Sequence, residues 1–203
     1  DGSVCSDAAI GLTLNTNGTS IAAANYNITA RSIAAGLVAA GGNVAVPAVG
    51  VAANYLANDA YNNTGALPLT VTYTVVGVSA GGCVGDPRVI TRIINPEPVV
   101  SATLGTTVCS DAAIGLTLNT NGTSVAAFNY NITARTIAGG LVAAGSNAVV
   151  PSSGVAANFL ANDKFTNTGN TPLAVTYTVE ALFVSGCGGH RELLTVPTRR
   201  SSV

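Results

Sequence analysis

The sequence predicts an all-β protein made of two tandem immunoglobulin-like β-sandwich domains. Three features support this: a repeated strand pattern, a domain-length duplication and closely spaced turn signals. The strand pattern LTVTYTVVGVSAGGC at residues 69–83 returns as LAVTYTVEALFVSGC at residues 173–187. Apolar residues alternate with threonine, which is typical of a strand with one buried face. We expect this strand to be central in each sandwich.

The whole chain is an internal duplication with a period of 104 residues. The segment VCSDAAIGLTLNTNGTS at residues 4–20 returns unchanged at residues 108–124. A period of this length corresponds to one complete domain rather than to the short unit of a solenoid. We therefore expect domain 1 over residues 1–95 and domain 2 over residues 96–203.

Short apolar runs between turn residues predict where the remaining strands of the first copy lie. We expect strands over residues 10–14, 26–31, 37–40, 44–46, 69–78 and 89–94, and either a strand or a short helical turn over residues 51–56. The prolines of Asn95-Pro96-Glu97-Pro98 predict a stiff, extended linker. Residues 99–104 then form a leading strand of domain 2, which domain 1 is expected to lack.

The four cysteines form two equivalent pairs, because Cys5 returns as Cys109 and Cys83 returns as Cys187. The simplest interpretation is one disulfide within each domain, joining Cys5 to Cys83 and Cys109 to Cys187; free buried thiols are the alternative. No CxxC motif is present, which argues against a zinc site. Disulfides indicate an oxidising location such as the periplasm, the cell surface or the medium.

The composition excludes several classes of partner. Charged residues make up 8% of the chain and the net charge is −1, whereas an ordinary soluble domain carries about 25% charged residues. No long-range field attracts nucleic acid or an acidic membrane. Glycine and proline break the uncharged runs at residues 32–58 and 136–162, so we expect no membrane insertion. The weakly charged surface suits packing against copies of the same chain, or a neutral or sugar-covered exterior.

Polar residues that recur in both copies are candidate sites. Asp7 and Asp111, like Asp59 and Asp163, are too few per domain to predict a calcium site, and turn or capping roles are favoured. His190 is the single histidine, and no nucleophile motif accompanies it. We therefore expect it in a surface loop, and we expect no catalytic residue, cofactor or metal.

Arg31 and Arg135 recur within a predicted strand, where they are either a glycan or partner contact or simply exposed. The N-x-Thr triplets begin at Asn17, Asn27, Asn62, Asn121 and Asn131. These asparagines are interpreted as turn residues, with glycosylation left open.

Four aromatic residues offer either core packing or a sugar-stacking platform. Tyr55 and Tyr61 of the first copy are replaced by Phe159 and Phe165 in the second. Because both replacements remove a hydroxyl group, core packing is the favoured interpretation.

Seven motifs carry a resemblance to a known family. VCSD, IGLTLNTNGTS, NYNIT, LANDAYNNTG, PLTVTYTV, GCVGDP and INPEP follow one another over residues 4–98. Together they resemble the PKD-like repeat of large cell-surface proteins of Bacteroidetes, and the resemblance covers both copies. It implies β-sandwich domains strung in tandem on secreted, often adhesive, proteins. The second copy departs after Cys187, where HRELLTVPTRR replaces DPRVITRIINP.

These observations favour a non-catalytic structural or interaction protein. The chain would be a segment or subunit of an extracellular fibre or adhesin stalk at the bacterial cell surface. Its expected partners are copies of itself or neighbouring repeats, with surface glycans as a further candidate. Head-to-tail assembly is expected by strand addition, in which a tail containing Leu193, Leu194, Thr195 and Val196 completes the next copy. The alternative function is a carbohydrate-binding or spacer module of a secreted hydrolase.

Overall fold

The computed structural model describes residues 2–184 and 186–200, and this part of the chain contains strands and turns but no helix. The chain divides into two compact units, Asp1–Pro96 (unit 1) and Glu97–Val203 (unit 2). Within the described residues, each unit contains a five-stranded sheet and a two-stranded sheet. The prediction of an all-β fold is confirmed.

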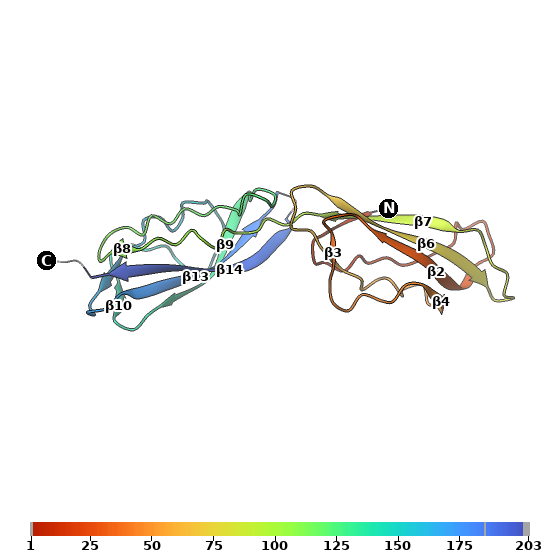
Figure 1. Ribbon diagram of the computed structural model, residues 1–203, viewed down its shortest axis with the longest axis horizontal. Helices are drawn as coiled ribbons and strands as arrows, with labels where there is room; N and C mark the ends of the chain where they lie inside the picture. The colour runs from red at the N-terminus through yellow and green to blue at the C-terminus, as the bar shows by residue number, and fades with distance from the viewer. Residues whose placement is uncertain (1, 185, 201–203) are drawn as a thin grey trace. The chain divides into compact units, whose positions relative to one another are not determined.

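Unit 1 contains seven strands among its described residues. They are β1 (Gly2–Cys5), β2 (Ala23–Ile33), β3 (Val38–Ala39), β4 (Ala48–Val51), β5 (Tyr61–Asn62), β6 (Leu69–Ser79) and β7 (Arg88–Asn95). The five-stranded sheet has the order β1-β7-β6-β2-β4, and β3 pairs with β5 in the small sheet. Figure 1 shows β2, β6 and β7 running side by side.

The described part of unit 2 repeats this arrangement. Its strands are β8 (Val108–Cys109), β9 (Asn129–Ile137), β10 (Leu141–Ala143), β11 (Ser152–Val155), β12 (Phe165–Asn167), β13 (Leu173–Leu182) and β14 (Gly188–Arg199). The large sheet has the order β8-β14-β13-β9-β11, and β10 pairs with β12.

Strand β6 occupies the centre of its sheet, as the alternating pattern predicts. It pairs antiparallel with β2 on one side and with β7 on the other. Val71 and Tyr73 are both 0% exposed, whereas the intervening threonines face away from the core. Strand β13 holds the same position in unit 2, where it pairs with β9 and β14.

Several short apolar runs pack into the core without forming the expected strands. Ile10, Leu12 and Leu14 are buried, and the residues between them are exposed. This segment makes only isolated backbone hydrogen bonds, such as the one from the Leu14 N–H to the Ala53 carbonyl at 2.8 Å. Residues 44–46 form no strand, and residues 53–58 are turns that follow β4. Burial therefore follows the apolar pattern more closely than the hydrogen-bond ladder does.

The predicted disulfide pairing is wrong. Cys5 and Cys187 are disulfide-bonded, whereas Cys83 and Cys109 are exposed free thiols. Neither Cys5 with Cys83 nor Cys109 with Cys187 forms a bond, so the expectation of one disulfide within each domain fails.

The position of strand β7 explains the error in unit 1. Cys5 lies opposite Asn95, at the end of β7, while Cys83 lies in the turn before Arg88, where β7 begins. Eight residues of strand separate these two points, which is a distance of more than about 20 Å. A disulfide requires Cα atoms within about 7 Å. The equal spacing of the cysteines in sequence carries no information about this separation.

Candidate functional site

A buried aspartate organises the core of unit 1. Asp59 is 0% exposed, and its carboxylate accepts hydrogen bonds from the Val44 N–H at 2.8 Å and the Tyr73 hydroxyl at 2.7 Å. The Arg31 guanidinium lies 3.6 Å from the same carboxylate. The Tyr61 and Tyr73 hydroxyl oxygens are 2.5 Å apart. Because Tyr73 donates to Asp59, Tyr61 is the donor in this second bond.

Unit 2 contains the same cluster with one member changed. Asp163 accepts from the Ala148 N–H at 2.7 Å and the Tyr177 hydroxyl at 2.6 Å, and the Arg135 guanidinium lies 3.3 Å away. Phe165 replaces the second tyrosine and is 1% exposed. The cluster in unit 2 therefore has one buried hydroxyl fewer.

The buried tyrosines remain protonated well above ordinary pH. Burial, followed by the neighbouring Tyr61 hydroxyl and the Asp59 carboxylate, raises the pKa of Tyr73. Burial raises the pKa of Tyr177 in the same way, with Asp163 as the next cause. Each protonated hydroxyl therefore stays a donor to its carboxylate. Both carboxylates are buried away from solvent. We therefore infer a structural role for the clusters, which hold the turn segments against the sheets, and not a role in chemistry on a substrate.

The sequence prediction for these residues was partly right. Asp59 and Asp163 do bind backbone N–H groups, as expected for a turn role. The pairing with Arg31 and Arg135 was missed, although both arginines and both aspartates recur 104 residues apart. That joint recurrence was the available signal, but sequence alone does not show that a strand arginine faces a distant turn.

The linker segment Pro98–Ser101 closes one side of unit 2. The Val99 N–H donates to the Ser124 Oγ at 3.0 Å, and the Val99 carbonyl accepts from the Asn121 N–H at 2.9 Å. The Ser101 N–H donates to the Asn119 carbonyl at 3.0 Å. Between these contacts, Val100 is 2% exposed and belongs to the hydrophobic core. The predicted leading strand over residues 99–104 does not form: Val100 makes an isolated bridge with Thr120, and residues 102–103 are turn.

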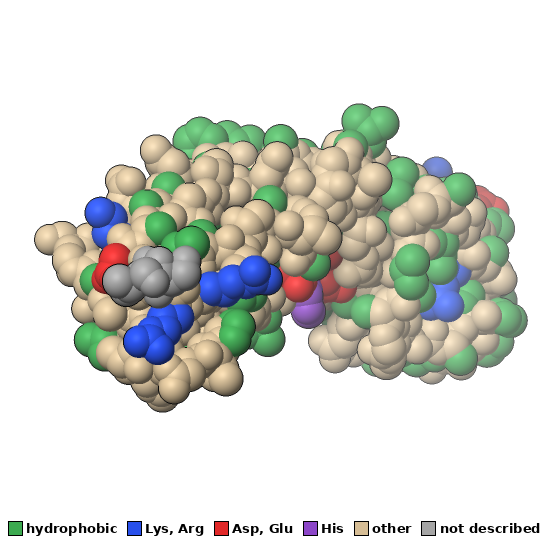
Figure 2. Space-filling view, turned by 60° about the vertical axis from the view of Figure 1, so that its left-hand side comes forward, with side chains coloured by type: hydrophobic (Ala, Val, Ile, Leu, Met, Phe, Trp, Pro, Cys, Tyr) green, Lys and Arg blue, Asp and Glu red, His purple; other side chains and the backbone are tan. Residues whose placement is uncertain are grey.

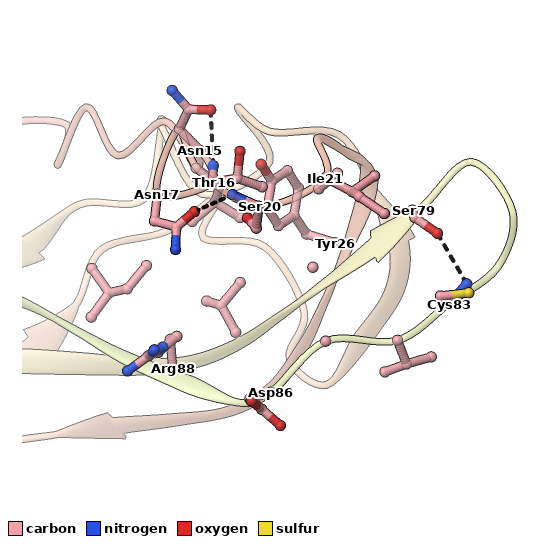
Figure 3. A pocket seen from close by; sticks show the side chains of 17 residues that line it. Asn15, Thr16, Asn17, Ser20, Ile21, Tyr26, Ser79, Cys83, Asp86 and Arg88 are labelled. Atoms are coloured by element: carbon pink, nitrogen blue, oxygen red, sulfur yellow. Dashed lines mark hydrogen bonds between the residues drawn. The ribbon is translucent and has the colours of Figure 1, made fainter.

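Unit 1 has an open pocket of about 750 Å³ beside its large sheet. Figure 3 shows Asn15, Asn17 and Ser20 on one wall and Asp86 with Arg88 on the opposite wall. The pocket floor includes strand residues of β6, and Tyr26 of β2 also lines it. The free thiol of Cys83 belongs to the lining as well. This pocket is the candidate binding surface of unit 1.

The charged side chains are sparse on the face that Figure 2 shows, where uncharged polar and hydrophobic groups cover most of the surface. His190 is exposed and lies in strand β14 rather than in a loop. Within residues 2–184 and 186–200, no group of three or more His, Cys, Asp or Glu side chains is placed to hold a metal ion.

The recurring aspartates near the first cysteine of each unit have turn geometry. Asp7 and Asp111 adopt positive φ angles of 61° and 66°. Asp7 accepts a hydrogen bond from the Asn62 amide at 3.1 Å, and Asp111 accepts from the Thr166 hydroxyl. These carboxylates join the turn to a strand of the small sheet.

The candidate sugar-stacking aromatics pack into the protein. Tyr61 and Phe165 are 0% and 1% exposed, which agrees with the core interpretation. Tyr55 and Phe159 are partly buried and pack against the two cores, and the Tyr55 hydroxyl donates to the Ala45 carbonyl at 3.1 Å.

The side chains of the asparagines in the N-x-Thr triplets form hydrogen bonds within the described structure, most of them with backbone N–H groups. The Asn17 side-chain oxygen accepts from the Thr19 and Ser20 N–H groups, and Asn27 accepts from the Gly50 N–H. Their equivalents make the same contacts in unit 2. Asn62 bonds Asp7 through its amide nitrogen.

The predicted strand-addition tail lies inside strand β14. Residues 193–196 pair with β13, and Leu194 and Val196 are both 0% exposed in the core of unit 2. Leu193 is exposed. Donating this stretch to another molecule would require the sheet of unit 2 to open, because the stretch already pairs with β13.

The described sheets of each unit define a β-sandwich protein. Residues 3–98 match the family model of the PKD-like domain, so the resemblance to a PKD-like domain, and no finer part of that prediction, is confirmed over these residues. No curated protein matches the sequence. Among the described residues, no helix is long and apolar enough to cross a membrane.

Proposed function

We propose that the chain is a non-catalytic structural segment of an extracellular fibre or adhesin stalk, built from tandem immunoglobulin-like domains of the PKD-like kind. One observation supports this most strongly. Unit 2 completes its core with Val100, which comes from the linker segment that leads into the unit. A module that is completed by the chain preceding it is suited to joining in series.

The two units are built on one plan, which favours a repeated mechanical element. Their large sheets share one strand order, and a buried aspartate with its tyrosine and arginine partners occurs in both. Repetition of a whole domain extends a surface structure without requiring new chemistry in each copy. The oxidised state of Cys5 and Cys187 supports a location outside the reducing cytosol.

Electron microscopy of intact cells tests the proposal. Gold-labelled antibodies raised against the 203-residue chain should bind beaded threads on unpermeabilised cells. A fraction of threads that have been sheared from the cells should be enriched in the protein. Cells that lack the gene provide the control. Labelling that requires permeabilisation, with no threads on the surface, would contradict the proposal.

A further inference from the structure

Each unit carries two types of cysteine, and one of each type is oxidised. Cys5 and Cys109 end the first strand of their unit, and we call them the first-strand cysteines. Cys83 and Cys187 lie in the turn before the last strand of their unit, and we call them the hairpin cysteines. The oxidised cysteines are Cys5 and Cys187. The free thiols, Cys109 and Cys83, are again one of each type.

The two cysteines of one unit are too far apart to bond each other. In unit 2, Cys109 lies opposite Arg199, the last residue of β14, and Cys187 directly precedes the first residue of that strand. The 12 residues of β14 separate them by more than about 30 Å. Strand β7 separates Cys5 from Cys83 in the same way. Because a disulfide needs Cα atoms within about 7 Å, a bonded cysteine of either type has its partner in a different unit.

The first-strand cysteine has the same backbone setting whether it is bonded or free. Both β1 and β8 are edge strands that pair in parallel with the last strand of their unit. The Cys5 carbonyl accepts a hydrogen bond from the Ala8 N–H at 3.2 Å, and the Cys109 carbonyl accepts one from the Ala112 N–H at 3.2 Å. Cys109 is exposed, whereas Cys5 is partly buried. The free thiol therefore occupies the position from which its equivalent is bonded.

The hairpin cysteine also keeps its backbone geometry in both states. The Cys83 carbonyl accepts from the Ser79 N–H at 2.9 Å, and the Cys187 carbonyl accepts from the Phe183 N–H at 2.9 Å. Figure 3 shows Cys83 in the turn that follows Ser79. Cys187 is 2% exposed, whereas Cys83 is exposed and open to a partner. Because the turn already has the geometry of its bonded equivalent, little ordering opposes bond formation at Cys83.

We propose that Cys83 and Cys109 form disulfides with further PKD-like units, Cys109 with a hairpin cysteine and Cys83 with a first-strand cysteine. Between identical chains, the bond joins Cys109 of one copy to Cys83 of the next. A neighbouring repeat with a cysteine at the complementary position offers the same chemistry. Bonds of this kind join units head to tail and need not close into a ring. This inference rests on the proposed structural function and names the covalent link between its units.

The bond between copies forms by two exchange steps with a low-molecular-weight disulfide such as oxidised glutathione. The Cys83 thiolate attacks one glutathione sulfur, the glutathione S–S bond breaks, and one reduced glutathione leaves. The Cys109 thiolate of another copy then attacks the Cys83 sulfur of the mixed disulfide, and the second glutathione leaves. The two protein thiols thus lose two protons and two electrons, which the glutathione disulfide gains.

Two matched variants of the whole chain test the pairing. Cys83→Ser keeps Cys109 as a free thiol, and Cys109→Ser keeps Cys83. Each variant alone, and an equal mixture at the same total concentration, is incubated with oxidised glutathione and analysed by non-reducing gel electrophoresis. The mixture should form about ten-fold more dimer than either variant alone, because only the mixture contains both types of thiol and gains from their complementary docking.

The unsubstituted chain and a double variant complete this experiment. The unsubstituted chain should form a ladder of oligomers in which mass spectrometry finds Cys83 bonded to Cys109. The variant with both substitutions should stay monomeric, and circular dichroism checks that all variants are folded. Equal dimer in the single and mixed samples, no dimer in any sample, or a Cys83-to-Cys109 bond within one monomer would overturn the proposal.

Threads sheared from cells identify which unit supplies the partner. Proteolysis under non-reducing conditions, followed by mass spectrometry, identifies the peptides bonded to Cys83 and Cys109. A Cys83-to-Cys109 peptide identifies copies of this chain, and a bond to the complementary cysteine of a different PKD-like sequence identifies a neighbouring repeat; both results support the proposal. Threads in which both thiols are free would overturn it and leave the structural function standing. An absence of threads contradicts the structural function instead.

Discussion

Unit 1 and unit 2 share a strand order and a polar core cluster but differ in the exposure of one loop, which spans residues 15–20 in unit 1 and residues 119–124 in unit 2. The loop sequence is identical in the two units, yet Ser124 is buried beneath the linker while Ser20 is exposed. The difference therefore comes from the neighbouring segment rather than from the loop. A second difference, Tyr61 against Phe165, lies inside the core. Both differences can be tested by substituting residues in one unit and measuring the stability of each unit.

The largest effect is expected at alkaline pH, where the two units should behave alike. The pKa values of Tyr73 and Tyr177 are raised above the ordinary value of 10.0, so the folded chain holds protons that the unfolded chain releases. Their contribution to stability is complete below about pH 10 and is lost as the pH rises further. Tyrosinate absorbance of the buried residues should appear together with loss of the strand signal in circular dichroism. Ionisation of both tyrosines near pH 10 in an intact fold would refute this.

The next effect should be confined to unit 2. Val100→Ala removes two methyl groups from a buried position and should lower the free energy of unfolding of unit 2 by about 2 kcal/mol. Hydrogen–deuterium exchange with peptide-level resolution should show faster exchange in strands β9 and β13, with unit 1 unchanged. Val142→Ala is the matched control, because Val142 is a strand valine that is 56% exposed. Equal effects of the two substitutions would mean that Val100 does not belong to the core.

The smallest effect should come from exchanging the aromatic pair. Tyr61→Phe removes one buried hydrogen bond but leaves the Tyr73 bond to Asp59 intact, so unit 1 should lose about 1 kcal/mol. The reciprocal Phe165→Tyr restores the unit 1 arrangement in unit 2 and should change its stability by less than about 1 kcal/mol. Urea denaturation of both variants measures the changes. A loss of several kcal/mol in Tyr61→Phe would show that the second hydroxyl organises the whole cluster.

Parts of the site followed from residue patterns and parts did not. The alternation in residues 69–78 correctly predicted a central strand, because a strand with one buried face imposes a period of two on its side chains. The apolar alternation at Ile10, Leu12 and Leu14 correctly indicated burial but not a regular strand. Packing needs the right side chains on one side of the chain, whereas a ladder also needs a neighbouring backbone in register.

The cysteines show the limit of reasoning from spacing. Two equivalent pairs suggested two equivalent disulfides, but strand β7 places Cys5 and Cys83 at its opposite ends. Leu194 and Val196, which were predicted to belong to a donated tail, lie in the core beside β13. The disulfide error arose because the direction and pairing of the last strand of each unit were unknown.

By itself, the sequence determined the all-β class, the 104-residue duplication and the apolar faces of the main strands, since these depend on local periodicity and composition. The tertiary structure decided which cysteines are oxidised and which arginine meets which aspartate. Those outcomes depend on distances between segments far apart in the chain, and only the paired sheets set such distances.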